Sequence, residues 1–112
     1  MCGGTFAVNS GINTSGSWKY VNFGNFKVYW LFNTQSKTFG GNSWNHYDIS
    51  LPVTYNKDKM AVVASGGPSD NAISVSPRVY NGGNIIRVSW VNNYGGSITC
   101  SIDINAILVD FT

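Results

Sequence analysis

From Trp18 onward, short runs of apolar residues alternate with clusters of turn-forming residues along the chain. The clearest alternation runs from Tyr47 to Val53, where every second residue is apolar. A period of two places such residues on one face of a half-buried β-strand. Short strands at regular intervals with turn signals between them are typical of a β-sandwich or barrel.

The first two predicted strands cover Trp18 to Phe23 and Phe26 to Asn33. Gly24 and Asn25 lie between them, and both residue types accept the positive φ that a tight hairpin turn requires. A polar stretch from Thr34 to Asn45 follows, and we interpret it as a loop.

The second half of the chain predicts five further strands. They are, in order, Met60 to Ser65, Ile73 to Val79, Ile86 to Trp90, Ile98 to Ile102 and Ile104 to Phe111. The first is a nearly continuous apolar run, which fits a strand covered on both faces. Pro77 lacks a backbone donor, so we expect it to interrupt or bulge the second. The last is apolar on both faces, which places it at the centre of a sheet or against another subunit.

The composition opposes helices. The chain has no glutamate, one glutamine and three leucines, against fourteen asparagines and sixteen aromatic residues. Helices favour long unbranched side chains, which are nearly absent here. With 112 residues, 43% of them hydrophobic, the chain fits one domain. We therefore expect an all-β fold, a compact antiparallel β-sandwich over residues 17–112, preceded by a flexible lead-in over residues 1–16.

The charge distribution disfavours some partners. The net charge is +2, and the basic residues are scattered singly instead of forming a stripe that could follow a phosphate backbone. No segment reaches the roughly 20 apolar residues that span a bilayer. We therefore expect no nucleic-acid partner and no membrane insertion, and no signal peptide is visible at the N-terminus.

Two cysteines do not form a disulfide framework. Cys100 alternates with Ile98 and Ile102, which predicts a buried thiol on an apolar strand face. Cys2 lies in a glycine-rich start and is expected to be exposed. A bridge between the two remains an open alternative.

Residues that could carry catalysis are few and dispersed. The chain has five aspartates and one histidine, and no Gly-x-Ser-x-Gly motif accompanies His46 and Asp48. No spacing suits a transition metal. A calcium site that uses Asp58 or Asp70 with turn carbonyls remains an alternative. We expect a protein that is not an enzyme and has no catalytic residue, no metal and no cofactor.

The polar loops hold the best ligand-binding candidates, which are Trp44, His46, Asn93 and Tyr94. Aromatic rings stack on the C–H faces of sugars, and amides and imidazoles hydrogen-bond their hydroxyl groups. The alternative is structural, because asparagine is common in turns and Trp44 could cap one end of the fold. The other three tryptophans, Trp18, Trp30 and Trp90, are expected in the core.

The order of elements resembles a known group. The run from Trp18 to Trp30, with its aromatic residues around Gly24-Asn25, resembles the opening of the C-terminal domains of bacteriophage tail fibres and receptor-binding proteins, typified by the gp53-like tail fibre tips. Tyr47 to Tyr55, Met60 to Ser65 and Ala106 to Phe111 resemble later strands of that group. Gly24-Asn25 departs from the group's Asn-Gly but keeps the turn chemistry.

This resemblance implies a homotrimeric fibre tip that recognises a host-surface polysaccharide or protein receptor. Residues 1–16 would then form a junction with an upstream fibre shaft. The protein would be made in the host cytoplasm and would act outside the cell as part of the virion. Two alternatives remain, a monomeric carbohydrate-binding module or small lectin, and a structural trimerisation cap of a fibre.

Overall fold

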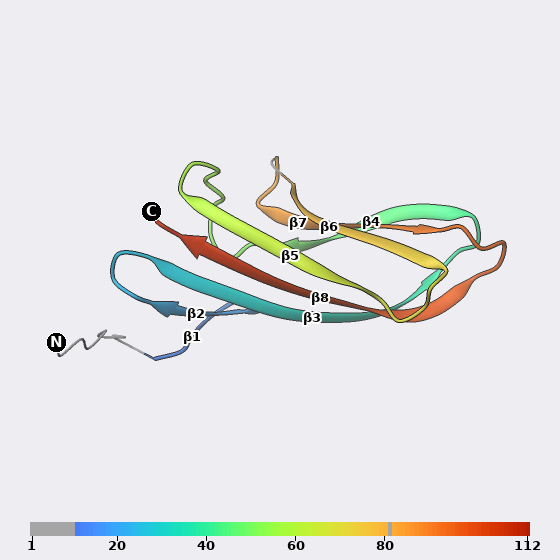
Figure 1. Cartoon of the computed structure of the whole chain (residues 1–112), viewed down its shortest axis with the longest axis horizontal. Helices are drawn as coiled ribbons and strands as arrows, with labels where there is room; N and C mark the ends of the chain where they lie inside the picture. The colour runs from blue at the N-terminus through green and yellow to red at the C-terminus, as the bar shows by residue number, and fades with distance from the viewer. Residues whose placement is uncertain (1–10, 81) are drawn as a thin grey trace.

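The computed structural model describes residues 11–80 and 82–112, and it contains only strands, turns and irregular segments there. The strands are β1 (Asn13–Ser15), β2 (Trp18–Asn22), β3 (Lys27–Phe39), β4 (Ser43–Ser50), β5 (Met60–Pro68), β6 (Ile73–Tyr80), β7 (Ile85–Asn92) and β8 (Ile98–Asp110). They form a five-stranded sheet of order β1-β2-β3-β8-β5 and a three-stranded sheet of order β4-β7-β6 (Figure 1). The predicted all-β, antiparallel fold is confirmed.

One hydrophobic core joins the inner faces of the two sheets. Ile102, Ile104 and Leu108 of β8 point into it from the five-stranded sheet, and Ile86 and Val88 of β7 from the three-stranded sheet. Each of these side chains is at most 2% exposed. Burial of an aliphatic side chain of this size contributes roughly 1.5–3 kcal/mol. Ile86 and Val88 are two residues apart, so they share the inward face of β7.

The molecule is elongated, in contrast to the compact outline expected from the sequence (Figure 1). β3 and β8 pair continuously over 13 residues, from Lys27↔Asp110 to Phe39↔Ile98. At a rise of about 3.3 Å per residue, this ladder is about 40 Å long. The predicted loop after Asn33 is wrong, because the chain continues as β3 along β8 to Phe39.

Two other expectations for the strands are corrected. β5 is not covered on both faces, since it forms an edge of the five-stranded sheet and Val63 is 68% exposed. Pro77 does not interrupt β6, which is continuous and pairs Pro77 with Val88. β6 is also an edge strand, and proline is tolerated there because one side of its backbone has no ladder partner.

The last strand takes the central position that the sequence allowed. The two predicted segments after Ile98 form the single strand β8, between β3 and β5. Cys100 is buried on its inner face, as predicted. Cys2, and with it any bridge to Cys100, lies outside the described residues.

The sheet begins earlier in the chain than the sequence predicted. Residues 13–15, expected within the lead-in, form β1 and pair with β2. The β2–β3 turn and the C-terminus lie at one end of the molecule (Figure 1). The β3–β4, β5–β6 and β7–β8 turns lie at the opposite end, which we call the tip.

Candidate functional site

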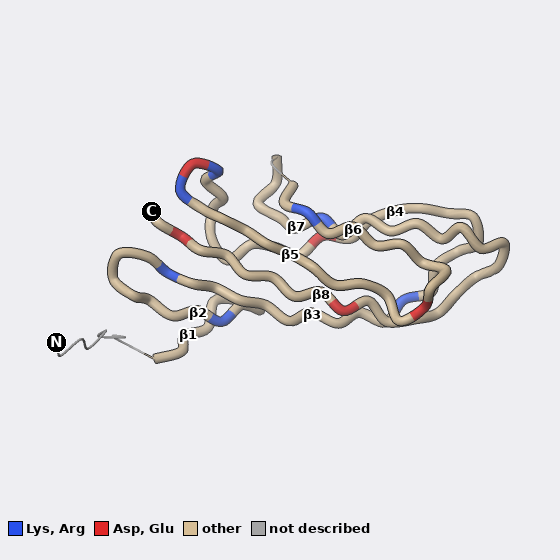
Figure 2. Tube along the Cα trace, viewed as in Figure 1, with Lys and Arg blue, Asp and Glu red and all other residues tan. Residues whose placement is uncertain are grey.

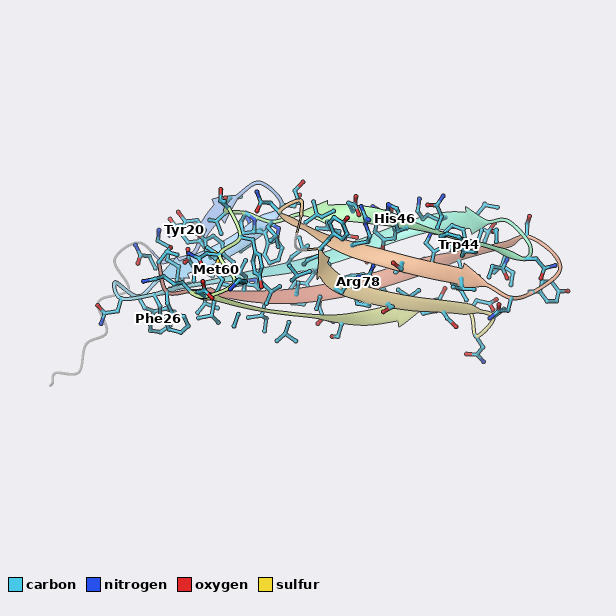
Figure 3. The ribbon with its side chains drawn as sticks, turned by 90° about the horizontal axis from the view of Figure 1, so that it is seen from above. Tyr20, Phe26, Trp44, His46, Met60 and Arg78 are labelled. Atoms are coloured by element: carbon cyan, nitrogen blue, oxygen red, sulfur yellow. The ribbon has the colours of Figure 1, made fainter. Side chains whose placement is uncertain are left out.

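Trp44 and His46 lie on strand β4, and the prediction of a loop there is wrong. A short turn at residues 40–42 leads directly from β3 into β4, with Asn42 at φ 49°. Both side chains are on the outer face of the three-stranded sheet, and Trp44 is 77% exposed (Figure 3). Trp44 is therefore an exposed ring on a rigid strand and not a cap over the core.

Asn93 and Tyr94 lie in the β7–β8 turn at the tip, as the sequence predicted. The backbone N–H of Tyr94 donates to Asn92 Oδ1 at 2.9 Å, and that of Asn42 donates to the Tyr94 carbonyl at 2.8 Å. The side chain of Tyr94 is nevertheless 59% exposed. Two backbone hydrogen bonds thus hold the turn while its ring remains available to a ligand.

The strand register brings three of the four predicted residues to one end. Trp44 pairs with Val91, which precedes Asn93 by two residues, so Trp44, Asn93 and Tyr94 all lie at or next to the tip. His46 pairs with Ser89, one outward row further from the tip. Within residues 11–80 and 82–112, no hydrogen bond or ring contact joins two of these four side chains. They form an extended surface instead of a closed pocket.

The outward row that follows His46 and Ser89 in the three-stranded sheet contains charged residues. Arg87 donates to Asp48 through Nε at 3.1 Å and Nη2 at 3.4 Å. Its guanidinium also lies 4.0 Å from the centre of the Tyr80 ring. The hydrogen bond to Asp48 raises the pKa of Arg87. Arg78 pairs directly with Arg87 in the register, so this row has one more positive than negative charge.

The sequence pattern around Arg87 indicates no role for this residue. Asp48 and Arg78, its neighbours in the strand register, are about 40 and 10 residues away along the chain. The sheet order β4-β7-β6 brings the three residues together. His46 lies two residues before Asp48 on the same face. The Asp48 carboxylate binds Arg87, and no hydrogen bond joins it to His46 among the described residues.

The outer face of the five-stranded sheet is mostly apolar near its middle. Trp30, Ile107 and Val63 form one cross-strand row, and Phe32 lies in the next. Phe32 is 81% exposed, Val63 68% and Ile107 51%. We call Val28, Trp30, Phe32, Val63 and Ile107 the apolar face. Trp30 was expected in the core, but its position in β3 directs it to this outer face, whereas Trp18 is buried and Trp90 packs edge-on against Phe39.

Besides the row of Asp48, Arg87 and Arg78, charged residues form a group in the β4–β5 loop, and the others are scattered over the chain (Figure 2). That group is Lys57, Asp58 and Lys59, where Lys57 and Asp58 form an exposed ion pair at 2.8 Å. Across the described ranges, no group of three or more potential metal ligands comes together. The same part of the chain also contains no helix long and apolar enough to cross a membrane.

Comparisons of the chain with protein-family models, curated proteins and solved structures found no match in any of the three. No family or structural neighbour therefore assigns a role to any residue. The case for a function rests on the tip and on the two outer faces of the sheets.

Proposed function

We propose that this chain is the C-terminal β-sandwich domain of a phage tail fibre, which recognises a host-surface polysaccharide and works as a homotrimer. The observation that carries the proposal is the apolar face of the five-stranded sheet, which is exposed in the single chain. The resemblance of several strand motifs to tail fibre tips supports the same assignment.

In this proposal the apolar face is the interface between subunits. Contiguous exposed apolar side chains usually mark an interaction surface. The row of Trp30, Ile107 and Val63 and the row of Val28 and Val109 contain no charged residue on β3, β8 or β5, while Lys19 of β2 continues the first row beside Trp30. Identical copies can therefore meet over β3, β8 and β5 without like-charge repulsion, with Lys19 at the border of the contact, which suits a second and third copy of this chain as the occupants.

The tip and the three-stranded sheet then remain free for the receptor. The upstream shaft joins at the end that carries β1, and the β3–β4 and β7–β8 turns point away from it (Figure 1). The rings of Trp44 and Tyr94 stack on sugar faces, while Asn93 and His46 hydrogen-bond sugar hydroxyls. Three copies supply avidity, so that weak single contacts add to firm attachment.

Each of the two alternative functions, a monomeric sugar-binding protein and a trimerisation cap, differs from the proposed fibre tip in one property. A carbohydrate-binding module or small lectin would bind glycan as a monomer. A trimerisation cap would assemble but bind no glycan. The proposed fibre tip has both properties, and it acts outside the cell as part of the virion after synthesis in the host cytoplasm.

The test is binding of the chain to an array of bacterial capsular polysaccharides and lipopolysaccharide O-antigens. We expect binding to at least one of them, weakened about tenfold or more by Trp44→Ala and by Tyr94→Ala, since exposed rings at binding sites carry much of the energy. Lys57→Ala, in the exposed loop at the opposite end, is the control and should leave binding unchanged. A chain that assembles but binds no polysaccharide on the array would be a cap.

A further inference from the structure

A cleft opens between the two sheets, where the inner face of β3 meets β4. β2 pairs with β3 only from Lys19↔Trp30 to Asn22↔Lys27. Among the described strands, no neighbour pairs with this side of β3 beyond that point, although β3 continues to Phe39. The cleft there has a volume of about 410 Å³, within the usual size range of ligand sites.

The lining of the cleft is mainly polar. Asn33 and Gln35 contribute side-chain amides from β3, and Ser17 and Ser50 border the cleft from the β1–β2 turn and the end of β4. Leu51 and Pro52 form an apolar portion of the wall. A wall of amides and hydroxyls with one apolar side is the combination that holds a sugar ring, through its hydroxyls and its C–H groups respectively.

One wall of the cleft is fixed by a buried tryptophan. Trp18 is 2% exposed, and its Nε1 donates to the Ser50 carbonyl at 2.8 Å. This bond ties β2 to the end of β4, so the two sides of the opening are held at a set spacing. A preformed site of this kind loses little conformational entropy when a ligand binds.

An acceptor without a partner lies in the wall of the cleft. Asn33 Oδ1 is buried, and no donor within residues 11–80 and 82–112 reaches it. Leaving a buried acceptor unpaired costs free energy, so such an atom is stabilised by any ligand that donates to it. The other buried atom of this kind in the described chain, Tyr47 Oη, lies on β4 two residues before Ile49, which also lines the cleft.

The charge of the cleft restricts the ligand further. Asp48 is the charged residue in its lining, and its carboxylate is engaged by Arg87. With no unpaired charge among the described residues of the lining, a ligand that donates and accepts hydrogen bonds without a net charge suits the cleft best. A neutral hexose, 6-deoxyhexose or N-acetylhexosamine residue has that chemistry.

We infer that this cleft binds one neutral sugar residue, with a ring hydroxyl donating to Asn33 Oδ1 after a turn of the Asn33 side chain brings this atom into the cleft, and neighbouring hydroxyls bonding the Gln35 amide. This deepens the proposed function, because it places one residue of the receptor polysaccharide between the sheets. It rests on that proposal for the source of the sugar, but the site itself can be tested with free sugars on the chain alone.

The experiment is a titration of the ¹⁵N-labelled chain with D-galactose, L-rhamnose and N-acetyl-D-glucosamine, followed by NMR. We expect at least one sugar to shift the side-chain NH₂ signals of Asn33 and Gln35 and the backbone signals of residues 15–17. Asn33→Leu, which removes the acceptor but keeps the size, should weaken binding about tenfold. Gln35→Ala is a second variant, since its side chain is only partly buried.

Asn25→Leu is the matched control, because it makes the same change in the exposed β2–β3 turn, outside the cleft and the tip, and should leave sugar binding unaffected. If no sugar shifts the Asn33 and Gln35 signals, or if Asn33→Leu binds as well as the unmodified chain, the cleft is not a sugar site. Repeating the polysaccharide array with Asn33→Leu separates the two proposals. If Asn33→Leu still binds polysaccharide, the inference about the cleft is wrong but the proposed function stands. If the unmodified chain binds no polysaccharide, the proposed function is contradicted.

Discussion

The buried side-chain amide of Asn92 donates to the carbonyl oxygen of Phe39 at 3.2 Å. Asn92 ends β7 in the three-stranded sheet and Phe39 ends β3 in the five-stranded sheet, so this contact joins the two sheets at the tip. The same nitrogen lies 3.0 Å from the Gly40 carbonyl and 3.2 Å from that of Gly96. The turns on which a receptor site would be built are thus fixed by one amide that is 1% exposed.

Replacing Asn92 with alanine removes this donor from three carbonyl groups and also removes the acceptor of the Tyr94 N–H. We expect Asn92→Ala to lower the free energy of unfolding by about 2–4 kcal/mol, measured by urea denaturation. Asn93→Ala changes the neighbouring exposed asparagine and should stay within about 0.5 kcal/mol of the unmodified protein. Equal effects of the two substitutions would show that Asn92 does not hold the tip.

Gly66 in β5 lies against the backbone of β8. Its φ is +135°, and a Cβ at this position would overlap the carbonyl oxygen of Asp103. Gly66→Ala should therefore destabilise the protein by about 2–4 kcal/mol, since neither backbone can move without breaking the ladder. Gly67→Ala is the matched control, because a Cβ there meets nothing within 4 Å. Thermal unfolding of the two variants compares them directly, and similar melting temperatures would contradict this account of the strand pairing.

Tyr47 makes stability depend on alkaline pH. Burial raises the pKa of its phenol above the usual 10.0, and the negative charge of Asp103 raises that pKa further. Above pH 10 the phenol ionises first in the unfolded state while the folded state keeps its proton, so the free energy of unfolding falls as pH rises.

Tyr47→Phe removes this ionisation and also a buried hydroxyl that has no partner in the described chain. We expect the variant to be as stable as the unmodified protein at pH 7, or up to about 1 kcal/mol more stable. We also expect it to lose less stability between pH 9 and 11, where Tyr29, whose pKa burial also raises, still contributes. Tyr94→Phe, at an exposed ring, should change neither quantity. A loss of stability at neutral pH on Tyr47→Phe would mean that the hydroxyl has a partner.

Phe32 tests the role of the apolar face. A carboxylate at this exposed position should leave folding intact but repel neighbouring copies, so we expect Phe32→Asp to be monomeric with an unchanged melting temperature at low protein concentration. Ser36→Asp adds the same charge two outward positions further along β3 and should not change assembly. Sedimentation velocity compares the two variants. If both variants assemble like the unmodified protein, the interface lies elsewhere.

The fold class could be predicted from the sequence because it depends on local patterns. The alternation from Tyr47 placed Tyr47 and Ile49 on the inward face of β4, although the strand ends at Ser50 and not at Val53, and the shortage of helix-forming residues excluded helices. The extent of β3 could not be predicted in this way. Asn33 and Gln35 face inward, where an apolar residue is expected, so the pattern indicated a loop although pairing with β8 continues.

The candidate sites were predicted less completely, because they depend on which strands are neighbours. The exposed positions of Trp44 and Tyr94 followed from residue type and turn chemistry, yet the strand location of Trp44 did not. The Asp48–Arg87 pair and the cleft beside Asn33 are made by residues far apart in the chain. No local pattern contains their register, and inward polar residues such as those that line the cleft are typical of a loop.

The central claim is that this domain assembles through its apolar face, and the most direct test is its molar mass in solution. Light scattering coupled to size-exclusion chromatography should give three times the 12.2 kDa of the single chain, constant over a range of protein concentrations. A mass of 12.2 kDa at every concentration would contradict the account. That result would favour a monomeric carbohydrate-binding module instead.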